Sequence, residues 1–239
     1  MKYLIKTFLF SFILLICVSI HAQTKGTMID PRDGQVYKTV EIGNQTWMAQ
    51  NLNYESTDSI FYKKFIQPIS MLNQFGICTP DSYCYGGVQI NCEKYGRLYH
   101  YDAAMKACPV GWHLPDTLEY RSLLSYVQQT TGNDKYKLYQ SLLPGGSSGF
   151  DLLYSGYRWP LFSQVKESPK AYNALGRQIC LLVSDSTQIT KKAKLTYQSR
   201  YNTAISLFFY IKKNSFTKFR FVEQNSYFLF SVRCIRDEE

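Results

Sequence analysis

The sequence predicts a single α+β domain, and three observations support that class. Aromatic residues make up 16% of the 239 residues, with 20 Tyr and 15 Phe, and such side chains favour strands and binding faces. Alternating apolar and polar residues lie near both ends of the chain, with helical patterns between them. At 45% hydrophobic residues, the chain can bury one large core, which excludes a disordered, collagenous or coiled-coil protein.

The first 22 residues have the pattern of an export signal. Lys2 and Lys6 precede an apolar run at residues 8–20, which is short for a bilayer span, and a small residue precedes a cleavage point before Gln23. We therefore expect residues 1–22 to be a signal peptide. The mature protein is then secreted, periplasmic or on the outer cell surface, with no transmembrane span after cleavage.

The net charge of the chain indicates which classes of partner it can bind. Cleavage removes two of the 27 basic residues and none of the 18 acidic ones, which leaves a mature net charge of +7. A basic surface suits acidic glycans, lipid headgroups or nucleic acid. Nucleic acid is the least expected partner, because no basic helix, zinc-finger spacing or RNA-binding motif is present. We expect the lysine cluster at residues 191–194 to be a solvated loop or strand end.

The cysteines predict disulfides. Without Cys17, six cysteines remain, at positions 78, 84, 92, 108, 180 and 234, and an even set in an oxidising compartment favours bridges with fifteen possible connectivities. Cys84 and Cys92 are close enough to close a local loop, although Cys78 could compete for either partner. Zinc is not expected, because no Cys-x-x-Cys pair exists and the mature chain has only two histidines. No metal or other cofactor is predicted.

Local patterns at the start of the mature chain predict a leader and a hairpin. Residues 23–32 resemble no regular element and are expected to be a leader, with order beginning at Asp33. Residues 36–42 have the alternation of a strand, Gly43-Asn44 has the chemistry of a two-residue turn, and residues 45–49 form the returning strand. From residue 53 to 87 we expect a long surface excursion of the same domain.

Two helices are predicted in the middle of the chain. Residues 101–108 are good helix formers that end at Pro109. Asp116 can cap a second helix, with Glu119 at its third position, and residues 131–133 end it. The apolar face of this second helix has the spacing i, i+3, i+4 and i+7: Tyr120, Leu123, Leu124 and Val127.

The rest of the chain predicts loops followed by strands. Residues 143–203 are rich in loop-forming residues. Residues 205–211, 216–222 and 228–235 alternate and are separated by polar turns, which predicts an antiparallel meander. Cys234 lies on the apolar side of the last strand and should point into the core.

Three motifs resemble one known family. They are DGQVYKTVEIGNQTWMAQNLNY at residues 33–54, KYGRLYHYDAAMKACPVGWHLPDTLEYRSLL at 94–124 and FSVRCIRD at 230–237. In this order they resemble the Fibrobacter succinogenes major paralogous domain, a repeatedly duplicated module of exported bacterial proteins. The resemblance covers most of residues 33–239, which implies one domain there, and residues 143–224 depart from the Gly- and Trp-rich pattern of the family.

The same motifs resemble, more distantly, the C-type lectin-like fold. That resemblance implies a curled antiparallel sheet flanked by two helices with long loops, in which the first helix is tied to the last strand. It selects a Cys108–Cys234 bridge and a Cys84–Cys92 bridge, and it leaves Cys78 either free or paired with Cys180. Lectin calcium binding is not implied, because neither Glu-Pro-Asn nor Trp-Asn-Asp occurs in the chain.

Function is predicted less specifically than fold. In this fold the loops before the final strands usually carry recognition, and here they contain Tyr157, Arg158, Trp159 and Tyr172. Aromatic faces with one cation can stack on a sugar ring or anchor a protein. We therefore expect an exported, non-catalytic binding or adhesion module whose partner is a glycan or a surface protein.

One enzymatic alternative stays open. The related formylglycine-generating enzymes use a reactive cysteine pair, so an oxidoreductase-type enzyme of that kind would have to use Cys78 and Cys180. Other catalytic sites are not favoured. His113 is expected to be a hydrogen-bonded structural histidine, because Cys108, its nearest thiol, is expected in a bridge.

Overall fold

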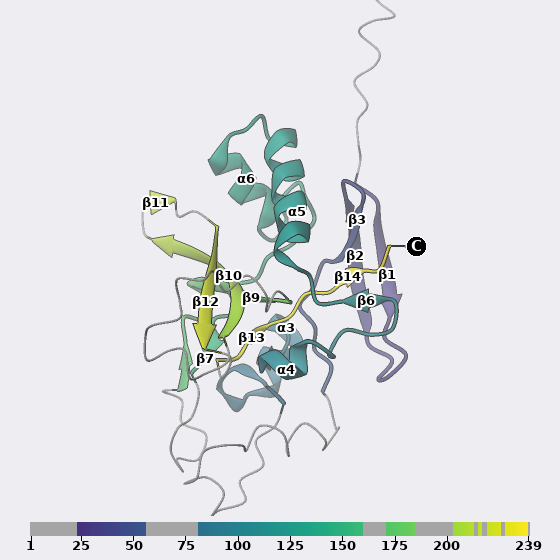
Figure 1. Cartoon of the computed structure of the whole chain (residues 1–239), viewed down its shortest axis with the longest axis vertical. Helices are drawn as coiled ribbons and strands as arrows, with labels where there is room; N and C mark the ends of the chain where they lie inside the picture. Colours follow the sequence, from purple (N-terminus) through teal and green to yellow (C-terminus); the bar gives the residue numbers. More distant parts are fainter. Residues whose placement is uncertain are drawn as a thin grey trace, which may run out of the picture.

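The computed structural model describes most of the chain after the predicted signal segment. The described residues are 23–55, 81–159, 171–184, 203–212, 215–216, 219–225 and 228–238. The predicted signal peptide at 1–22, most of the predicted excursion at 53–87, the lysine cluster at 191–194 and Cys78 lie outside these ranges. The described part is α+β, with antiparallel sheets, a few helices and two disulfides (Figure 1).

A five-stranded sheet contains both ends of the described chain. Its strands follow the order β1-β2-β3-β14-β6, and their bounds are β1 Lys25–Ile29, β2 Val36–Ile42, β3 Gln45–Met48, β14 Ile235–Arg236 and β6 Trp112–His113. The predicted hairpin is confirmed, because β2 and β3 pair antiparallel up to Ile42 and Gln45 across the two-residue turn. Gly43 takes a positive φ of 65° in that turn, which a side chain would disfavour.

Residues 23–32 were predicted to be an unstructured leader, and this prediction is wrong. Five of them form β1, which pairs antiparallel with β2 from Lys25 opposite Val40 to Ile29 opposite Val36. Four of the five are exposed, so the edge strand lacks the apolar alternation by which a strand is recognised. Asp30, directly after β1, is fully buried, so order begins well before Asp33.

The second sheet is built around β9, Gln178–Val183, whose six residues are all buried. Its strands follow the order β11-β10-β9-β13-β5-β4, with β12 also paired to β10. The other bounds are β10 Thr203–Lys212, β11 Ser215–Phe216, β12 Arg220–Asn225, β13 Phe230–Ser231, β5 Leu98–Tyr99 and β4 Ser82–Tyr83. The pairs of β10 with β9, β11 and β12 are antiparallel, whereas β13 meets β9 in parallel at one residue pair.

The predicted meander is correct for β10 to β12 and wrong for its last strand. Residues 228–235 were expected to form one strand beside their predecessor. Instead β13 joins the second sheet, Val232 to Cys234 leave strand pairing, and β14 joins the first sheet (Figure 1). The terminal segment 230–237 therefore connects the two sheets.

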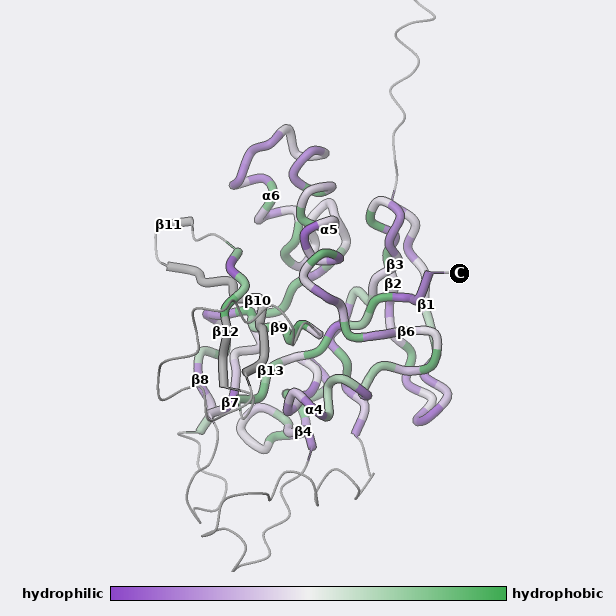
Figure 2. Tube along the Cα trace, viewed as in Figure 1, coloured by the Kyte–Doolittle hydropathy of each residue, from purple (hydrophilic) through white to green (hydrophobic). Residues whose placement is uncertain are grey.

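Four α-helices and a 3-10 turn complete the described part. Their bounds are η1 Tyr85–Gly87, α3 Gln89–Tyr95, α4 Tyr101–Ala104, α5 Thr117–Thr130 and α6 Lys135–Leu142. Helix α5 has the predicted capping box, in which Asp116 and Glu119 each accept a backbone N–H of the other residue. Helices α3 and α6 were not predicted, and hydrophilic residues lie on the outer turns of α6 (Figure 2).

The predicted apolar face of α5 is buried in the larger core cluster. Tyr120, Leu123 and Val127 of this helix pack there with Trp47 of β3 and Phe150, and Leu124 is partly buried beside them. The Trp47 ring lies 5.2 Å from Tyr120 and 5.3 Å from Phe150, measured between ring centroids. A second cluster surrounds the Cys108–Cys234 bridge, so the core touches both sheets.

The two disulfides implied by the lectin-like resemblance are present. Cys84 pairs with Cys92 across η1, and Cys108 pairs with Cys234 from 126 positions further along the chain. A bridge that closes so long a loop contributes about 5 kcal/mol at most in the chain-entropy model. Cys234 is fully buried, as expected.

Arg233 is fully buried beside this bridge and has no carboxylate within salt-bridge distance among the described residues. Its Nε and Nη2 donate to Asn51 Oδ1 at 3.2 and 2.9 Å, and its remaining bonds are donated to the carbonyl oxygens of Phe150 and Asp151. Burial lowers the pKa of Arg233 to about 10, so the side chain stays charged at neutral pH. Four backbone and side-chain bonds thus replace its hydration.

Three motifs far apart in the sequence meet at Asn51. Its side-chain Nδ2 donates to Tyr95 O at 2.9 Å while its Oδ1 accepts from Arg233. Gly96 is positioned so that a Cβ would lie 2.7 Å from both Asn51 Cβ and Leu52 O, and its φ is 74°. Only glycine fits that close approach without a shift of the backbone.

We expect Arg233→Met to lower the free energy of unfolding by about 2 to 4 kcal/mol, because buried acceptors lose their donors. Urea denaturation measures this change. Arg236→Met is the matched control, since Arg236 is exposed and lies over the Trp112 ring, and it should change stability by no more than about 0.5 kcal/mol. Equal effects of the two substitutions would contradict the role given to Arg233.

Candidate functional site

The four residues predicted to bind a ligand lie on one small ribbon. Strands β7, Tyr157–Arg158, and β8, Tyr172–Asn173, pair antiparallel, and Trp159 N donates to Ala171 O at 2.7 Å just beyond them. Arg158 also exchanges backbone hydrogen bonds with Leu229, at 3.0 and 3.1 Å. The ribbon is therefore fixed to the chain that leads into β13.

Alternation along β7 divides the four residues between two faces. Tyr157 and Trp159 lie on one face, with ring centroids 5.8 Å apart. Phe228 joins them, 4.9 Å from Trp159 and 6.1 Å from Tyr157. We call Tyr157, Trp159 and Phe228 the aromatic surface. Trp159 is 45% exposed, whereas Phe228 stacks on the buried Phe230 and so anchors this surface to the core.

Arg158 and Tyr172 lie on the opposite face of the ribbon. The Arg158 guanidinium carbon sits 3.9 Å from the centroid of the Tyr83 ring and 5.6 Å from that of Tyr172. Both residues are buried, at 2% and 7% exposure. The expectation of one surface combining aromatic faces with a cation is therefore corrected: strand alternation places the cation behind the exposed aromatic surface.

His100 lies near Arg158 and is half-buried, with its Nδ1 atom fully buried. Burial, and secondarily the charge of Arg158, lower the pKa of His100 to about 3, so its imidazole is neutral at physiological pH. Its backbone N–H donates to Asp81 O at 3.1 Å, and the residue directly precedes α4.

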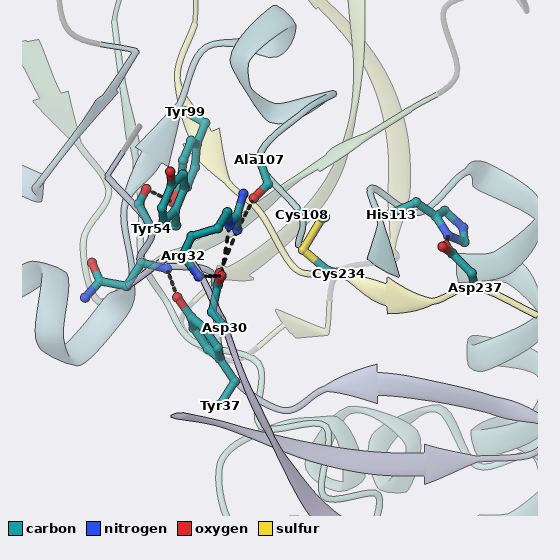
Figure 3. The surroundings of a disulfide bond; sticks show 11 residues. Asp30, Arg32, Tyr37, Tyr54, Tyr99, Ala107, Cys108, His113, Cys234 and Asp237 are labelled. Carbon is teal, nitrogen blue, oxygen red and sulfur yellow. Dashed lines mark hydrogen bonds and ion pairs between the residues drawn. A yellow bond between two sulfur atoms is a disulfide. The ribbon is translucent and has the colours of Figure 1, made fainter. Parts of the chain in front are cut away.

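Polar residues surround the Cys108–Cys234 bridge (Figure 3). Arg32 donates to both carboxylate oxygens of Asp30, at 2.9 and 2.6 Å, and to Ala107 O at 2.8 Å, next to Cys108. Its guanidinium lies 3.7 Å from the Tyr54 ring centroid. Burial alone would raise the pKa of Asp30, but the bonds from Arg32 outweigh it and lower that pKa. This cluster holds β1 against the bridge, and the leader prediction missed it.

His113 is held between two carboxylates, as the prediction of a structural histidine required. Its Nδ1 lies 2.6 Å from Asp237 Oδ1 (Figure 3), and its Nε2 lies 2.8 Å from Glu119 Oε1. Burial would lower the pKa of His113, but the two hydrogen bonds and the charges of these carboxylates outweigh it and raise the pKa. Both ring nitrogens are engaged, so neither is available as a general base.

Cys180 is a free thiol in β9 with no exposed surface. Burial raises its pKa, so it is not ionised near neutral pH. Within the described residues, no group of three or more His, Cys, Asp or Glu side chains is arranged to hold a metal ion. No helix of the described part is long and apolar enough to cross a membrane.

Comparison with known proteins gives one match. The family model described as the Fibrobacter succinogenes major domain matches residues 40–236. No curated protein and no solved structure matches the chain. Phe228, which packs against Tyr157 and Trp159, was not among the predicted site residues, although its place in an alternating segment indicated that it shares a face with Phe230.

We expect His113 to make stability depend on pH. Its pKa is raised on folding, so the stabilisation is complete below the unfolded pKa, about 6.5, and is lost as pH rises through the folded value. The difference in unfolding free energy between the protein and His113→Gln should therefore shrink from about pH 6 to about pH 9. Urea denaturation across this range measures it, and a constant difference would refute the proposed ion pairs.

We expect the Cys180 thiol to resist alkylation in the native protein and to react after unfolding, because it is fully buried and its pKa is raised. Iodoacetamide labelling followed by peptide mass mapping measures both states. The same map reports Cys78. Rapid native labelling of Cys180 would instead support the cysteine-dependent enzyme.

Proposed function

This chain belongs to the Fibrobacter succinogenes major domain family, and we propose that it is an exported, non-catalytic binding or adhesion module of the cell surface or extracellular space. The proposed ligand is a glycan or a surface protein. Nucleic acid and cofactors have no part in this proposal.

The observation that carries the proposal is the aromatic surface of Tyr157, Trp159 and Phe228. Three rings lie with centroids 4.9 to 6.1 Å apart, and the large Trp159 side chain is nearly half exposed. Aromatic faces of this kind cover a sugar ring or an apolar side chain. Backbone bonds of the ribbon and the Phe228–Phe230 stack hold the rings in place, which reduces the entropy lost on binding.

Two features support export. The protein has two disulfides, which form and persist in oxidising compartments. The sequence of residues 1–22 has the charged start, apolar run and small-residue end of a cleaved signal peptide. We propose that the mature protein begins near Gln23, directly before β1.

A C-type lectin-like arrangement is part of the same proposal. It is supported by the bridge from Cys108, four residues beyond α4, to the terminal segment and by helices beside antiparallel sheets; α4 itself ends at Ala104, before the predicted end at residue 108. Binding is proposed to be independent of calcium, because the sequence lacks the Glu-Pro-Asn and Trp-Asn-Asp strings of calcium-dependent lectins.

The alternative, an oxidoreductase-type enzyme that uses Cys78 and Cys180, has less support. The Cys180 thiol is buried in the middle of a sheet, and its raised pKa leaves little thiolate at neutral pH. Reactive cysteines normally lie in exposed, electropositive surroundings. No observation within the described ranges favours this enzyme over the binding module.

We expect Trp159→Ala to weaken binding to a ligand identified on a glycan array by about tenfold or more, because exposed tryptophans dominate such interfaces. Tyr136→Ala is the matched control: Tyr136 is 47% exposed on α6, close to the 45% of Trp159, and its substitution should leave affinity unchanged. Titration calorimetry measures both. Undiminished affinity after Trp159→Ala, or an equal loss in the control, counts against the aromatic surface.

A further inference from the structure

Arg158 is a buried cation without an oxygen partner in the described part of the chain. Its side chain is 2% exposed, and its Nε has no hydrogen-bond partner. No carboxylate of the described ranges forms a salt bridge with it. Burying a charge is costly unless hydrogen bonds or an opposite charge replace its hydration.

Three other arginines that the structure describes have oxygen acceptors; Arg233 and Arg97 are buried, and Arg32 is partly exposed. Arg233 donates to an amide oxygen and two carbonyl oxygens, Arg97 pairs with the carboxylate of Glu55, and Arg32 pairs with Asp30. Each guanidinium thus has at least one oxygen acceptor. Among the described residues the Arg158 guanidinium contacts ring faces, and its Nε has no hydrogen-bond partner.

The Nε edge of the Arg158 guanidinium is the part of this side chain that can still accept a ligand. Tyr83 covers a flat face of the guanidinium at 3.9 Å, which stabilises the cation but accepts no N–H bond. The edge that includes Nε is the one that binds carboxylates through two parallel hydrogen bonds. His100 is neutral, because burial and, secondarily, the charge of Arg158 lower its pKa, so it adds no second positive charge beside Arg158.

Two tyrosine rings connect Arg158 with a partly exposed loop. The half-buried Tyr85 ring lies 5.1 Å from Tyr172, which in turn flanks Arg158. Tyr85 begins η1, inside the loop that the Cys84–Cys92 bridge closes, and residues 86–90 of this loop are exposed. A ligand that reaches the buried Arg158 edge must therefore move neighbouring rings, and Tyr85 is the partly exposed one among them.

We infer that Arg158 binds the carboxylate of an acidic sugar, with Tyr85 as the stacking partner of the sugar ring. This site rests on the proposed binding function but lies on the opposite face of the β7–β8 ribbon from the aromatic surface. A carboxylate supplies the two acceptors that the guanidinium edge lacks, and a pyranose ring matches an aromatic face. The positive charge of the protein favours acidic over neutral glycans.

The test compares the affinities of D-galacturonate and D-galactose, of which only the first has a carboxylate. The protein is used with both disulfides formed. Titration calorimetry should show affinity for galacturonate at least about tenfold higher, because bonds to a charged group are lost with galactose. In nitrogen-detected spectra of the same protein, galacturonate should shift the Arg158 Nε–H signal and leave that of Arg236 unmoved. Equal affinities, or an unmoved Arg158 signal, would overturn the inference.

Substitutions distinguish the Arg158 site from the aromatic surface on which the proposed function rests. Arg158→Gln should reduce galacturonate affinity by about tenfold or more, whereas Arg236→Gln, an exposed arginine over the Trp112 ring, should not. Trp159→Ala should retain galacturonate binding. Loss of binding in Trp159→Ala alone overturns the Arg158 site and keeps the aromatic surface. If Arg158→Gln does not fold, the spectra of the unsubstituted protein decide.

The experiment also distinguishes the sugar acid from one competing ligand. An acidic side chain of a protein partner would offer the same carboxylate. If free glutamate shifts the Arg158 signal at lower concentration than galacturonate does, the sugar acid is wrong and the site belongs to a protein interface. A shift by galacturonate alone supports the inference.

Discussion

The structure depends on one constraint: the terminal segment 230–237 must hold both sheets at once. β13 pairs in the second sheet and β14 in the first, while between them Arg233 and Cys234 are fully buried. The Cys108–Cys234 bridge fixes this crossing covalently, and Arg233 fixes it through Asn51 and two carbonyl oxygens. Because Asn51 also binds Tyr95 O beside Gly96, the three motifs of the sequence converge on one buried polar hub.

Residues 228 and 229, directly before the terminal segment, position the proposed binding surfaces. Leu229 holds the β7–β8 ribbon through Arg158, and the Phe228–Phe230 stack fixes the aromatic surface. A rigid two-stranded ribbon then presents different chemistry on its two faces, with Trp159 exposed on one and Arg158 buried on the other. Binding residues that come from loops are more precise when a scaffold fixes them in this way.

Sequence reasoning predicted the local elements better than their long-range pairing. The β2–β3 hairpin and α5 follow from Gly43-Asn44 and from Asp116 with Glu119, which act within a few residues. β1 was missed because an exposed edge strand has no apolar alternation, and the split of residues 228–235 was missed because pairing with β9 and β3 is non-local. The four predicted site residues were expected in loops but lie on the β7–β8 ribbon, and the position of Arg158 on the face opposite Trp159 follows only from strand parity. Asp30 and Arg32 were assigned to a leader, so their contact with the bridge was not foreseen.

Amide hydrogen exchange at Met48 and Leu52 shows whether the terminal segment holds the two sheets together. These amides donate to Cys234 O at 3.0 Å and to Val232 O at 2.8 Å, so they report on the crossing itself. If the terminal segment holds the sheets together, both amides exchange only through global unfolding, with opening free energies equal to that of unfolding and well above those of the β1 edge. Exchange of either amide through a local opening of much lower free energy, with the rest of β3 still protected, would contradict the account.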